Sequence, residues 1–263
     1  MMGSTRPAQQ VPYESFRVTN AGGSSPVVFV CDHASNAIPP EFGTLGLTAG
    51  DLVRHIAWDP GALPVARLMA SALDATLVES TVSRLVIDCN RPLDAPDLIA
   101  STSETTPIPG NAALTEADRA RRIALAYDPF HAAIESVVED RLSTGRETWL
   151  VSVHSFTPVY RGVARPWEIG ILHDEDTRLA APLIAALRAE GGLSVGVNQP
   201  YSPADRVYHT LEVHGRRRGL ACAMIEIRND EISEEAGQQR WGERLSRIFA
   251  RLREQEEVRH AVG

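Results

Sequence analysis

Lysine is absent from this sequence of 263 residues, so all 26 basic residues are arginine. The absence excludes Schiff-base chemistry and a phosphate-binding P-loop, because both need a lysine amine. Acidic residues outnumber basic ones by 34 to 26, which gives a formal net charge of -8. Since the sequence also has no basic stripe that could neutralise phosphates, we expect no nucleic-acid partner.

Cysteine is scarce, and the three cysteines, Cys31, Cys89 and Cys222, each lie in an apolar run. An odd number without paired spacing argues against a disulfide framework, and buried thiols of this kind are usually inert. The N-terminal residues lack the pattern of a signal peptide, and no apolar stretch approaches membrane-spanning length. We therefore expect a soluble, cytoplasmic protein without a membrane partner, and the sequence leaves its oligomeric state open.

The common short catalytic motifs are also missing. The sequence contains no HExxH, no G-x-S-x-G, no GxGxxG and no CxxC. These motifs place metal ligands, a nucleophile, a dinucleotide or a redox pair within a few residues of one another. Any catalytic site must therefore be assembled from residues that are distant in the sequence.

What the sequence does contain is an alternation of short apolar runs and longer helical patterns. The apolar runs predict strands at 27–31, 76–79, 84–88, 149–153, 168–172, 194–197 and 221–227, and the helical patterns predict helices at 61–73, 115–141, 176–189, 204–218 and 233–257. Continuously apolar strands suit a sheet that is covered on both faces. We expect an α/β fold, a three-layer αβα sandwich with a mainly parallel, mixed central sheet.

The chain shows no internal repeat and no linker, so we expect one domain over residues 1–263, flexible at about 1–15 and 258–263. The predicted helix from Thr115 begins with a capping sequence in which Asp118 replaces the usual Glu, and Pro129 should kink this helix near Asp128. Residues 91–114 are rich in proline, serine and threonine without a period. Long loops of this kind are often lids over a binding site.

Polar residues stand at the ends of several predicted strands. His33, His154 and Glu226 close three of the apolar runs, and Arg91 follows a fourth. Because ligands in open α/β sheets bind beyond the carboxyl ends of the strands, we expect these side chains to converge at one edge of the sheet.

Two imidazoles and a carboxylate form a common ligand set of catalytic zinc, which lowers the pKa of a bound water to about 7. We therefore predict His33 and His154 as ligands of Zn²⁺ or another divalent metal. Asp59 is the preferred third ligand, since the neutral amide of Asn36 is a poor one and would instead orient the site. Glu226 would act as the general base, and the planar fork of Arg91 would hold a substrate carboxylate.

The same residues also fit a structural interpretation. Histidines at strand ends are more often hydrogen-bonded structural groups than metal ligands. Glu226 could favour the start of a following helix, and Arg91 could pair with Asp88 or Asp94. The spacing of the residues leaves the two interpretations open.

Seven segments occur in the order expected for the N-formylglutamate amidohydrolase family, which the chain resembles from about residue 26 to 250: CDHASNAIP, HIAWDPGA, SRLVIDCNRP, YDPFH, VSVHSFTP, NQPYSPAD and IEIRND. The resemblance implies a fold similar to that of zinc-dependent exopeptidases. It also implies a hydrolase of carbon–nitrogen bonds that removes the formyl group from N-formyl-L-glutamate, a late step of histidine breakdown, or from similar N-formyl amino acids.

The resemblance implies further site residues. Asn90 and Arg91 resemble the Asn-Arg pair that grips a substrate carboxylate in carboxypeptidase-like enzymes, and Arg84 would help to bind a second carboxylate. Tyr127 and His131 lie one helical turn apart and would face the cleft, where Tyr127 would donate to a developing oxyanion.

The sequence departs from the carboxypeptidase pattern H-x-x-E, because Asn36 stands where the acid is expected. This departure leaves the third metal ligand open between Asp59 and Asn36. Two alternatives to the formyl hydrolase follow. The first is a deacylase for another N-acyl amino acid, and the second is a non-catalytic binding protein of the same fold.

Overall fold

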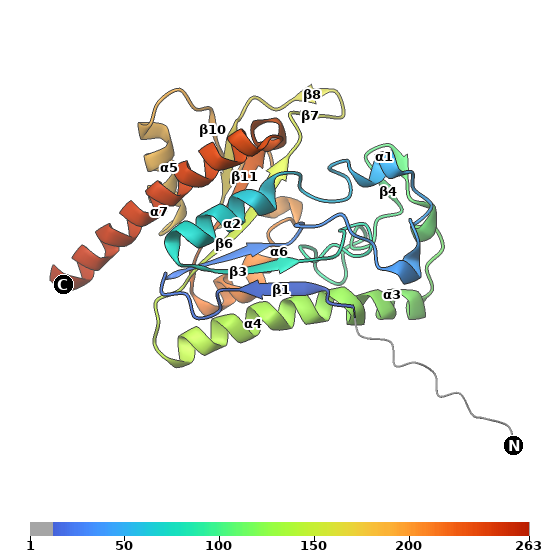
Figure 1. The fold of residues 1–263 in the computed structure, drawn as a ribbon, viewed down its shortest axis with the longest axis horizontal. Helices are drawn as coiled ribbons and strands as arrows, with labels where there is room; N and C mark the ends of the chain where they lie inside the picture. The colour runs from blue at the N-terminus through green and yellow to red at the C-terminus, as the bar shows by residue number, and fades with distance from the viewer. Residues whose placement is uncertain (1–12, 263) are drawn as a thin grey trace, which may run out of the picture.

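Residues 13–262 are described by a computed structural model of the chain (Figure 1). The expected flexibility of the first dozen residues and of the last one falls outside the described residues. Within them, the C-terminal helix α7 (Glu235–Val262) continues through the residues from 258 onward that we expected to be flexible.

A mixed sheet of 7 strands forms the middle layer, in the order β1-β3-β2-β6-β11-β9-β10. Its strands are β1 (Phe16–Thr19), β2 (Val27–Cys31), β3 (Thr76–Ser80), β6 (Trp149–Phe156), β9 (Ile169–Leu172), β10 (Val195–Val197) and β11 (Ala221–Arg228). The central strands β3, β2, β6 and β11 are parallel, whereas β1 and β9 each run antiparallel to a neighbour. Four parallel strands therefore end at the same edge of the sheet.

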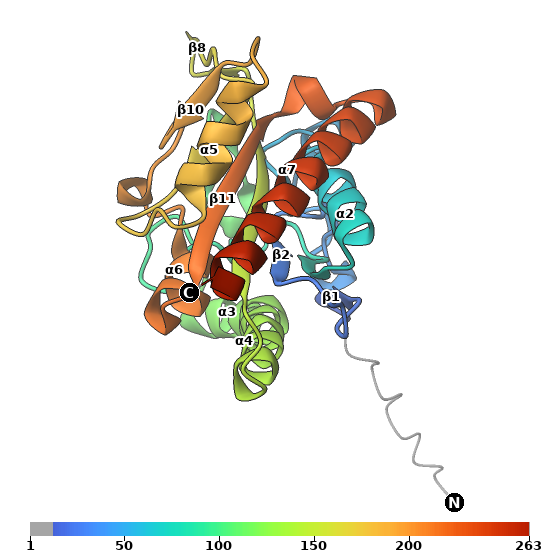
Figure 2. The ribbon, with the colours of Figure 1, turned by 90° about the vertical axis from the view of Figure 1, so that its left-hand side faces the viewer.

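Helices cover both faces of this sheet. Helices α2 (Ala62–Leu73), α5 (Ala180–Ala189) and α7 pack on one face, where Figure 2 shows them side by side. Helices α4 (Asp128–Ser143) and α6 (His209–His214) pack on the other. Strand β2 shows why two cores form: Phe29 belongs to the first core and its neighbours Val28 and Val30 to the second, as alternating side chains of a strand must. The predicted three-layer αβα sandwich is confirmed.

The predicted helix at 115–141 is present, with an irregular turn. Thr115 caps α3 (Glu116–Arg122) in a reciprocal capping box with Asp118, as predicted. A π-helical turn (Ile123–Tyr127) joins α3 to α4. Pro129, in the first turn of α4, has no N–H to donate to the preceding turn, which accounts for an irregularity at this point.

Two expectations about strands are wrong. Residues 84–88 form turns instead of a strand, because their main chain is held by local contacts: Val86 N donates to Ser83 O over 2.9 Å, and Asp88 N donates to Leu98 O over 2.8 Å. The run is apolar because it is buried beneath a loop and not because it belongs to the sheet. Strand β1 went unpredicted, since it is a short, half-exposed edge strand.

Two predicted helices are shorter than expected. The segment 176–189 becomes helical only at Ala180, and the segment 204–218 contains α6 between two 3-10 turns (Pro203–Asp205 and Arg216–Arg218). Further 3-10 turns lie at Pro40–Phe42, Pro109–Asn111 and Asn229–Ile232, and a short helix α1 at Ala49–Leu52. Among the described residues, no helix is both long and apolar enough to cross a membrane.

Two small hairpins lie outside the main sheet. The first, β4 (Thr102–Ser103) with β5 (Thr106–Pro107), interrupts the long loop predicted at 91–114, and the second pairs β7 (Val159–Tyr160) with β8 (Val163–Ala164) just after β6. Residues of both hairpins line a cavity at the carboxyl edge of the parallel strands.

Candidate metal centre and active-site cavity

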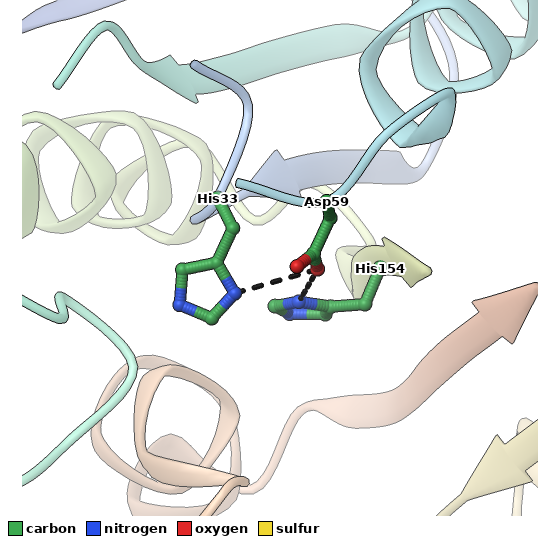
Figure 3. A group of neighbouring side chains, drawn as sticks. All are labelled: His33, Asp59 and His154. Carbon is green, nitrogen blue, oxygen red and sulfur yellow. Dashed lines mark hydrogen bonds and ion pairs between the residues drawn. The ribbon is translucent and has the colours of Figure 1, made fainter. Parts of the chain in front are cut away.

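Three side chains from separate parts of the chain meet at the carboxyl edge of the sheet. His33 follows β2 directly, His154 lies near the end of β6, and Asp59 lies in the turn before α2. One potential ligand atom from each residue lies within 4.8 Å of those of the other two. Figure 3 shows both imidazole rings beside the Asp59 carboxylate. The structure thus brings together the three residues predicted as metal ligands.

The same nitrogen of each ring faces the carboxylate. Nδ1 of His154 lies 2.8 Å from Oδ2 of Asp59, and Nδ1 of His33 lies 3.4 Å from the same oxygen. The backbone N–H of Ser155 also donates to this oxygen over 3.3 Å. The two histidines and the aspartate place their potential ligand atoms around one small volume. They therefore form a buried group that could hold a metal ion.

The opposite nitrogen of each ring is held by a second carboxylate. Nε2 of His33 lies 2.7 Å from Oδ1 of Asp88. Nε2 of His154 lies 3.1 Å from Oδ2 of Asp32 and 2.7 Å from the Ser152 hydroxyl, which itself donates to Asp32. Carboxylates in this position fix the ring and its tautomer and leave Nδ1 to bind a metal.

The charge of this group favours a cation. Burial would raise the pKa of Asp32, Asp59 and Asp88, but the neighbouring histidines, with Arg84 for Asp88, hold each pKa below its ordinary value. Burial would likewise lower the pKa of the two imidazoles, but the carboxylates outweigh it and raise both. The carboxylates around the two imidazoles therefore favour positive charge at this place. A divalent cation would satisfy the same demand.

Glu226 completes the edge of the site. Strand β11 pairs with β6 so that Glu226 stands opposite His154, and the carboxyl group is buried. Among the described residues, its Oε2 atom has no hydrogen-bond partner. Burial raises the pKa of Glu226 to about 7. This is the range that suits a general base near neutral pH.

These groups open into a cavity of about 310 Å³. Its wall includes the predicted residues His33, Asp59, Arg84, Asn90, Arg91, His154 and Glu226. The long loop contributes Thr102, Ser103 and Glu104, and the β7–β8 hairpin contributes Tyr160 and Arg161. The cavity is large enough for a small metabolite.

Two of the predicted substrate-binding residues are already engaged. Arg84 contacts Oδ2 of Asp88 at 2.6 Å and Oδ1 of Asp59 at 3.4 Å. The amide of Asn90 donates to Val207 O and accepts from Thr210 N. Both side chains therefore support the site from its wall. Arg91 is held less tightly, because its shorter ion pair, at 2.8 Å, is with the half-exposed Asp97, whereas Asp88 lies 4.0 Å away.

Tyr127, His131 and Asn36 are not among the residues that line the cavity. The Tyr127 hydroxyl lies 3.0 Å from the Arg91 carbonyl and 2.7 Å from Nε2 of His209. His131 contacts Cys89 O and His214, and the Asn36 amide donates to Leu52 O over 2.8 Å. The geometry supports an indirect role for these three residues, since other protein groups occupy their polar atoms.

Sequence reasoning gave no role in the site to Asp32 or Asp88, the carboxylates behind the histidines. Each closes an apolar run in the sequence, at "VCD" and "VID", and both side chains are buried. A buried acid needs a partner, so its place after an apolar run was the available signal. Thr210, whose hydroxyl donates to Asp32, gave no such signal.

Comparison with known proteins places these features in a family. The family model described as N-formylglutamate amidohydrolase matches residues 25–233. A crystal structure of a gene product from Agrobacterium tumefaciens is similar over 92% of this chain and 96% of its own, with 46% sequence identity and a TM-score of 0.89. The crystal structure of N-formylglutamate amidohydrolase from Ralstonia eutropha JMP134 shares the fold, with 22% identity, a TM-score of 0.64 and coverage of 94% and 99% of the two chains. No curated protein sequence matches the chain.

Proposed function

Because this chain belongs to the N-formylglutamate amidohydrolase family, we propose that it hydrolyses the amide bond of a small N-formyl amino acid, such as N-formyl-L-glutamate, with a bound divalent metal. The observation that carries this proposal is the buried group of His33, Asp59 and His154, with the unpartnered oxygen of Glu226 beside it. The reaction adds water to the formyl carbon, breaks the carbon–nitrogen bond and releases formate and the free amino acid.

His33, Asp59 and His154 would hold the metal, and zinc fits this donor set of two imidazoles and one carboxylate. When bound, the ion would supply a Lewis acid that polarises the carbonyl and makes water more acidic. Asp32 and Asp88 would keep the two imidazole rings in the orientation that presents Nδ1.

Glu226 would move the proton. Its buried carboxylate accepts a proton from the attacking water and then donates it to the departing nitrogen, which leaves as an amine. The unpartnered Oε2 atom supports this role, because a buried carboxylate oxygen without a hydrogen bond is available to a substrate or water.

Arg91 would position the substrate. Its guanidinium lines the cavity, its shorter ion pair is with the half-exposed Asp97, and Asp88 lies at 4.0 Å, so a substrate carboxylate can compete for the planar fork. Asn90 would help indirectly, since its amide fixes the backbone on either side of the cavity. The cytoplasmic location and the role in histidine breakdown stay predictions from the sequence.

The main alternative to this proposal concerns which acyl group is removed from the amino acid. The alternative is a deacylase for a longer acyl group. We favour the formyl substrate because the family model that matches the chain is described as N-formylglutamate amidohydrolase. The non-catalytic alternative rested on the missing acid at Asn36, and Asp59 supplies a carboxylate beside both histidines.

A direct test measures the release of formate and acetate from matched N-formyl and N-acetyl amino acids by the metal-loaded full chain, with elemental analysis of the same sample. We expect a bound divalent metal and faster turnover of the formyl compounds. Preference for the acetyl compounds would support the deacylase instead. A metal-loaded protein that releases neither acid would refute the proposed enzyme.

A further inference from the structure

Three arginines are buried in the described part of the chain; each has one nitrogen without a hydrogen-bond partner there, and none pairs with a carboxylate. They differ in how many other hydrogen bonds their guanidinium groups make. Arg122 donates to Val86 O, Asn111 Oδ1 and Gly110 O, and Arg141 donates to Thr148 Oγ1 and Ser25 O. Arg165 is 8% exposed, and no carboxylate among the described residues lies within ion-pair distance of it. Its Nη1 atom has no hydrogen-bond partner there.

Two tyrosine rings lie against this guanidinium. The central carbon of Arg165 lies 4.6 Å from the centre of the Tyr160 ring and 4.7 Å from that of Tyr201. Burial raises the pKa of the Tyr201 phenol, and the nearby Arg165 guanidinium acts in the opposite direction. Contact with an aromatic ring does not satisfy the N–H donors of a guanidinium, which lie in its plane and stay available to an anionic acceptor.

Both rings belong to the wall of the active-site cavity, and Arg165, which is not itself among the lining residues, lies next to them. Tyr160 lies in the β7–β8 hairpin, whose turn residues Arg161 and Gly162 both have positive φ, +50° and +81°, as in a two-residue hairpin turn. Tyr201 follows a loop that packs closely on β9. A Cβ at Gly170 of β9 would lie only 1.9 Å from Gln199 O, so the glycine allows this close approach. The hairpin and the loop are thus held against the site from two sides.

The cations of the opposite wall are occupied. Arg84, which the sequence suggested for a second carboxylate, is paired with Asp59 and Asp88. Arg91 remains for one carboxylate of the substrate. Arg161 lines the cavity at the tip of the hairpin and, within the described residues, also has no carboxylate partner. Unpaired positive charge therefore gathers on the hairpin side of the cavity.

We propose that Arg165, framed by Tyr160 and Tyr201 and assisted by Arg161, binds the side-chain carboxylate of a dicarboxylic substrate and so determines specificity. The assignment rests on the proposed function, in which Arg91 holds the other carboxylate. A buried guanidinium without an acid is costly, and a ligand carboxylate with two oxygens in one plane matches its donors. An isosteric substrate with a neutral amide in place of that carboxylate would leave them unsatisfied.

Binding tests this subsite without catalysis. Calorimetry would compare glutarate with its monoamide, which has the same length and one carboxylate fewer, on the metal-loaded full chain. We expect glutarate to bind about 10- to 100-fold more tightly, the range for a hydrogen-bonded charge pair. Arg165→Gln should remove this preference by weakening glutarate alone, and Arg165→Lys should restore part of it.

The matched control is Arg206→Gln. Arg206 lies outside the cavity and pairs with the exposed Asp94, so its loss should leave both affinities unchanged. Equal weakening of both ligands in Arg165→Gln would mean that the arginine only fastens the hairpin, which overturns the proposal. Equal affinity of the wild-type protein for the two ligands would overturn it even if the variant failed to fold.

Kinetics separate this proposal from the proposed function. With N-formyl-L-glutamate and N-formyl-L-glutamine, Arg165→Gln should raise KM for the glutamate compound alone and leave kcat unchanged. If the wild-type chain hydrolyses neither compound but still prefers glutarate, the proposed function fails and the subsite stands. If it hydrolyses both with equal kcat/KM and shows no preference in binding, the subsite fails and the hydrolase stands.

Discussion

The two walls of the cavity differ in how completely their charges are paired. On one wall, the segment from Arg84 to Arg91 packs its ionic groups against one another and against His33: Asp88 alone contacts the imidazole, the Arg84 guanidinium and the backbone N–H of Asn90. On the other side, Oε2 of Glu226 in the wall and Nη1 of Arg165 next to it are buried without a hydrogen-bond partner among residues 13–262.

The difference separates support from reaction. A fully satisfied network is rigid, because moving any member leaves a buried charge unpaired. Such a wall suits the orientation of metal ligands. Buried atoms without partners cost stability, and they persist where a ligand or a reacting group meets them. We therefore expect substitutions on the paired wall to change metal binding, and substitutions of unpaired groups to change turnover or substrate choice.

The largest loss of activity should come from substitution of the two histidines predicted to bind the metal. His154→Ala or His33→Ala should abolish turnover and the bound metal, because each removes one of three donor groups. Elemental analysis and formate release on the same samples would measure both losses. His173→Ala, a histidine whose ring contacts Asp174 O outside the cavity, serves as the control. Normal metal content in the double variant His33→Ala/His154→Ala would refute the ligand assignment.

Glu226→Gln tests the prediction that substitution of an unpaired buried group changes turnover and not metal binding. The amide keeps the shape of the side chain but cannot accept the proton, so kcat should fall by about 10²- to 10⁴-fold. Metal content should stay unchanged, because Glu226 is not one of the three donor groups. Steady-state kinetics with elemental analysis would check this. A loss of metal in step with the loss of activity would instead make Glu226 a ligand.

Asp88→Asn should show the opposite behaviour on the paired wall. Since the Asp88 carboxylate fixes the ring of His33, its loss should weaken metal affinity by about 10- to 100-fold. Activity should return when the metal concentration is raised. Competition with a metal-sensitive dye would measure the affinity, with Asp94→Asn as the control because Asp94 is exposed and lies outside the cavity. Unchanged metal affinity would show that the ring needs no carboxylate behind it.

The smallest loss of activity should come from Tyr127→Phe, which tests whether Tyr127 belongs to the catalytic site or only supports it. The Tyr127 hydroxyl contacts Arg91 O and His209, so its loss should lower kcat/KM by less than about 10-fold, as for an ordinary hydrogen bond. Loss of an oxyanion donor would cost about 10²- to 10³-fold. A fall of that size, measured with N-formyl-L-glutamate, would restore the catalytic role that the sequence suggested.

The local pattern of apolar residues predicted the strands correctly where both faces of a strand are covered by helices. The apolar runs of β2, β6 and β11 predicted their strands and the side chains at their ends, His33, His154 and Glu226. The same reasoning placed residues 84–88 in a strand, where burial beneath a loop produced an equally apolar run. Apolarity reports burial, and burial occurs in loops as well as in strands.

The sequence by itself determined the layered fold and the edge of the sheet where the site lies, because the periodicity of apolar residues and the ends of parallel strands are local properties of the chain. Only the tertiary structure decided which partners each polar group has. It placed Asp59 between two imidazoles, tied Arg84 to two aspartates and, within the described residues, left Nη1 of Arg165 without a hydrogen-bond partner. Such pairings depend on distances between residues far apart in the chain, and no pattern of neighbouring residues encodes them.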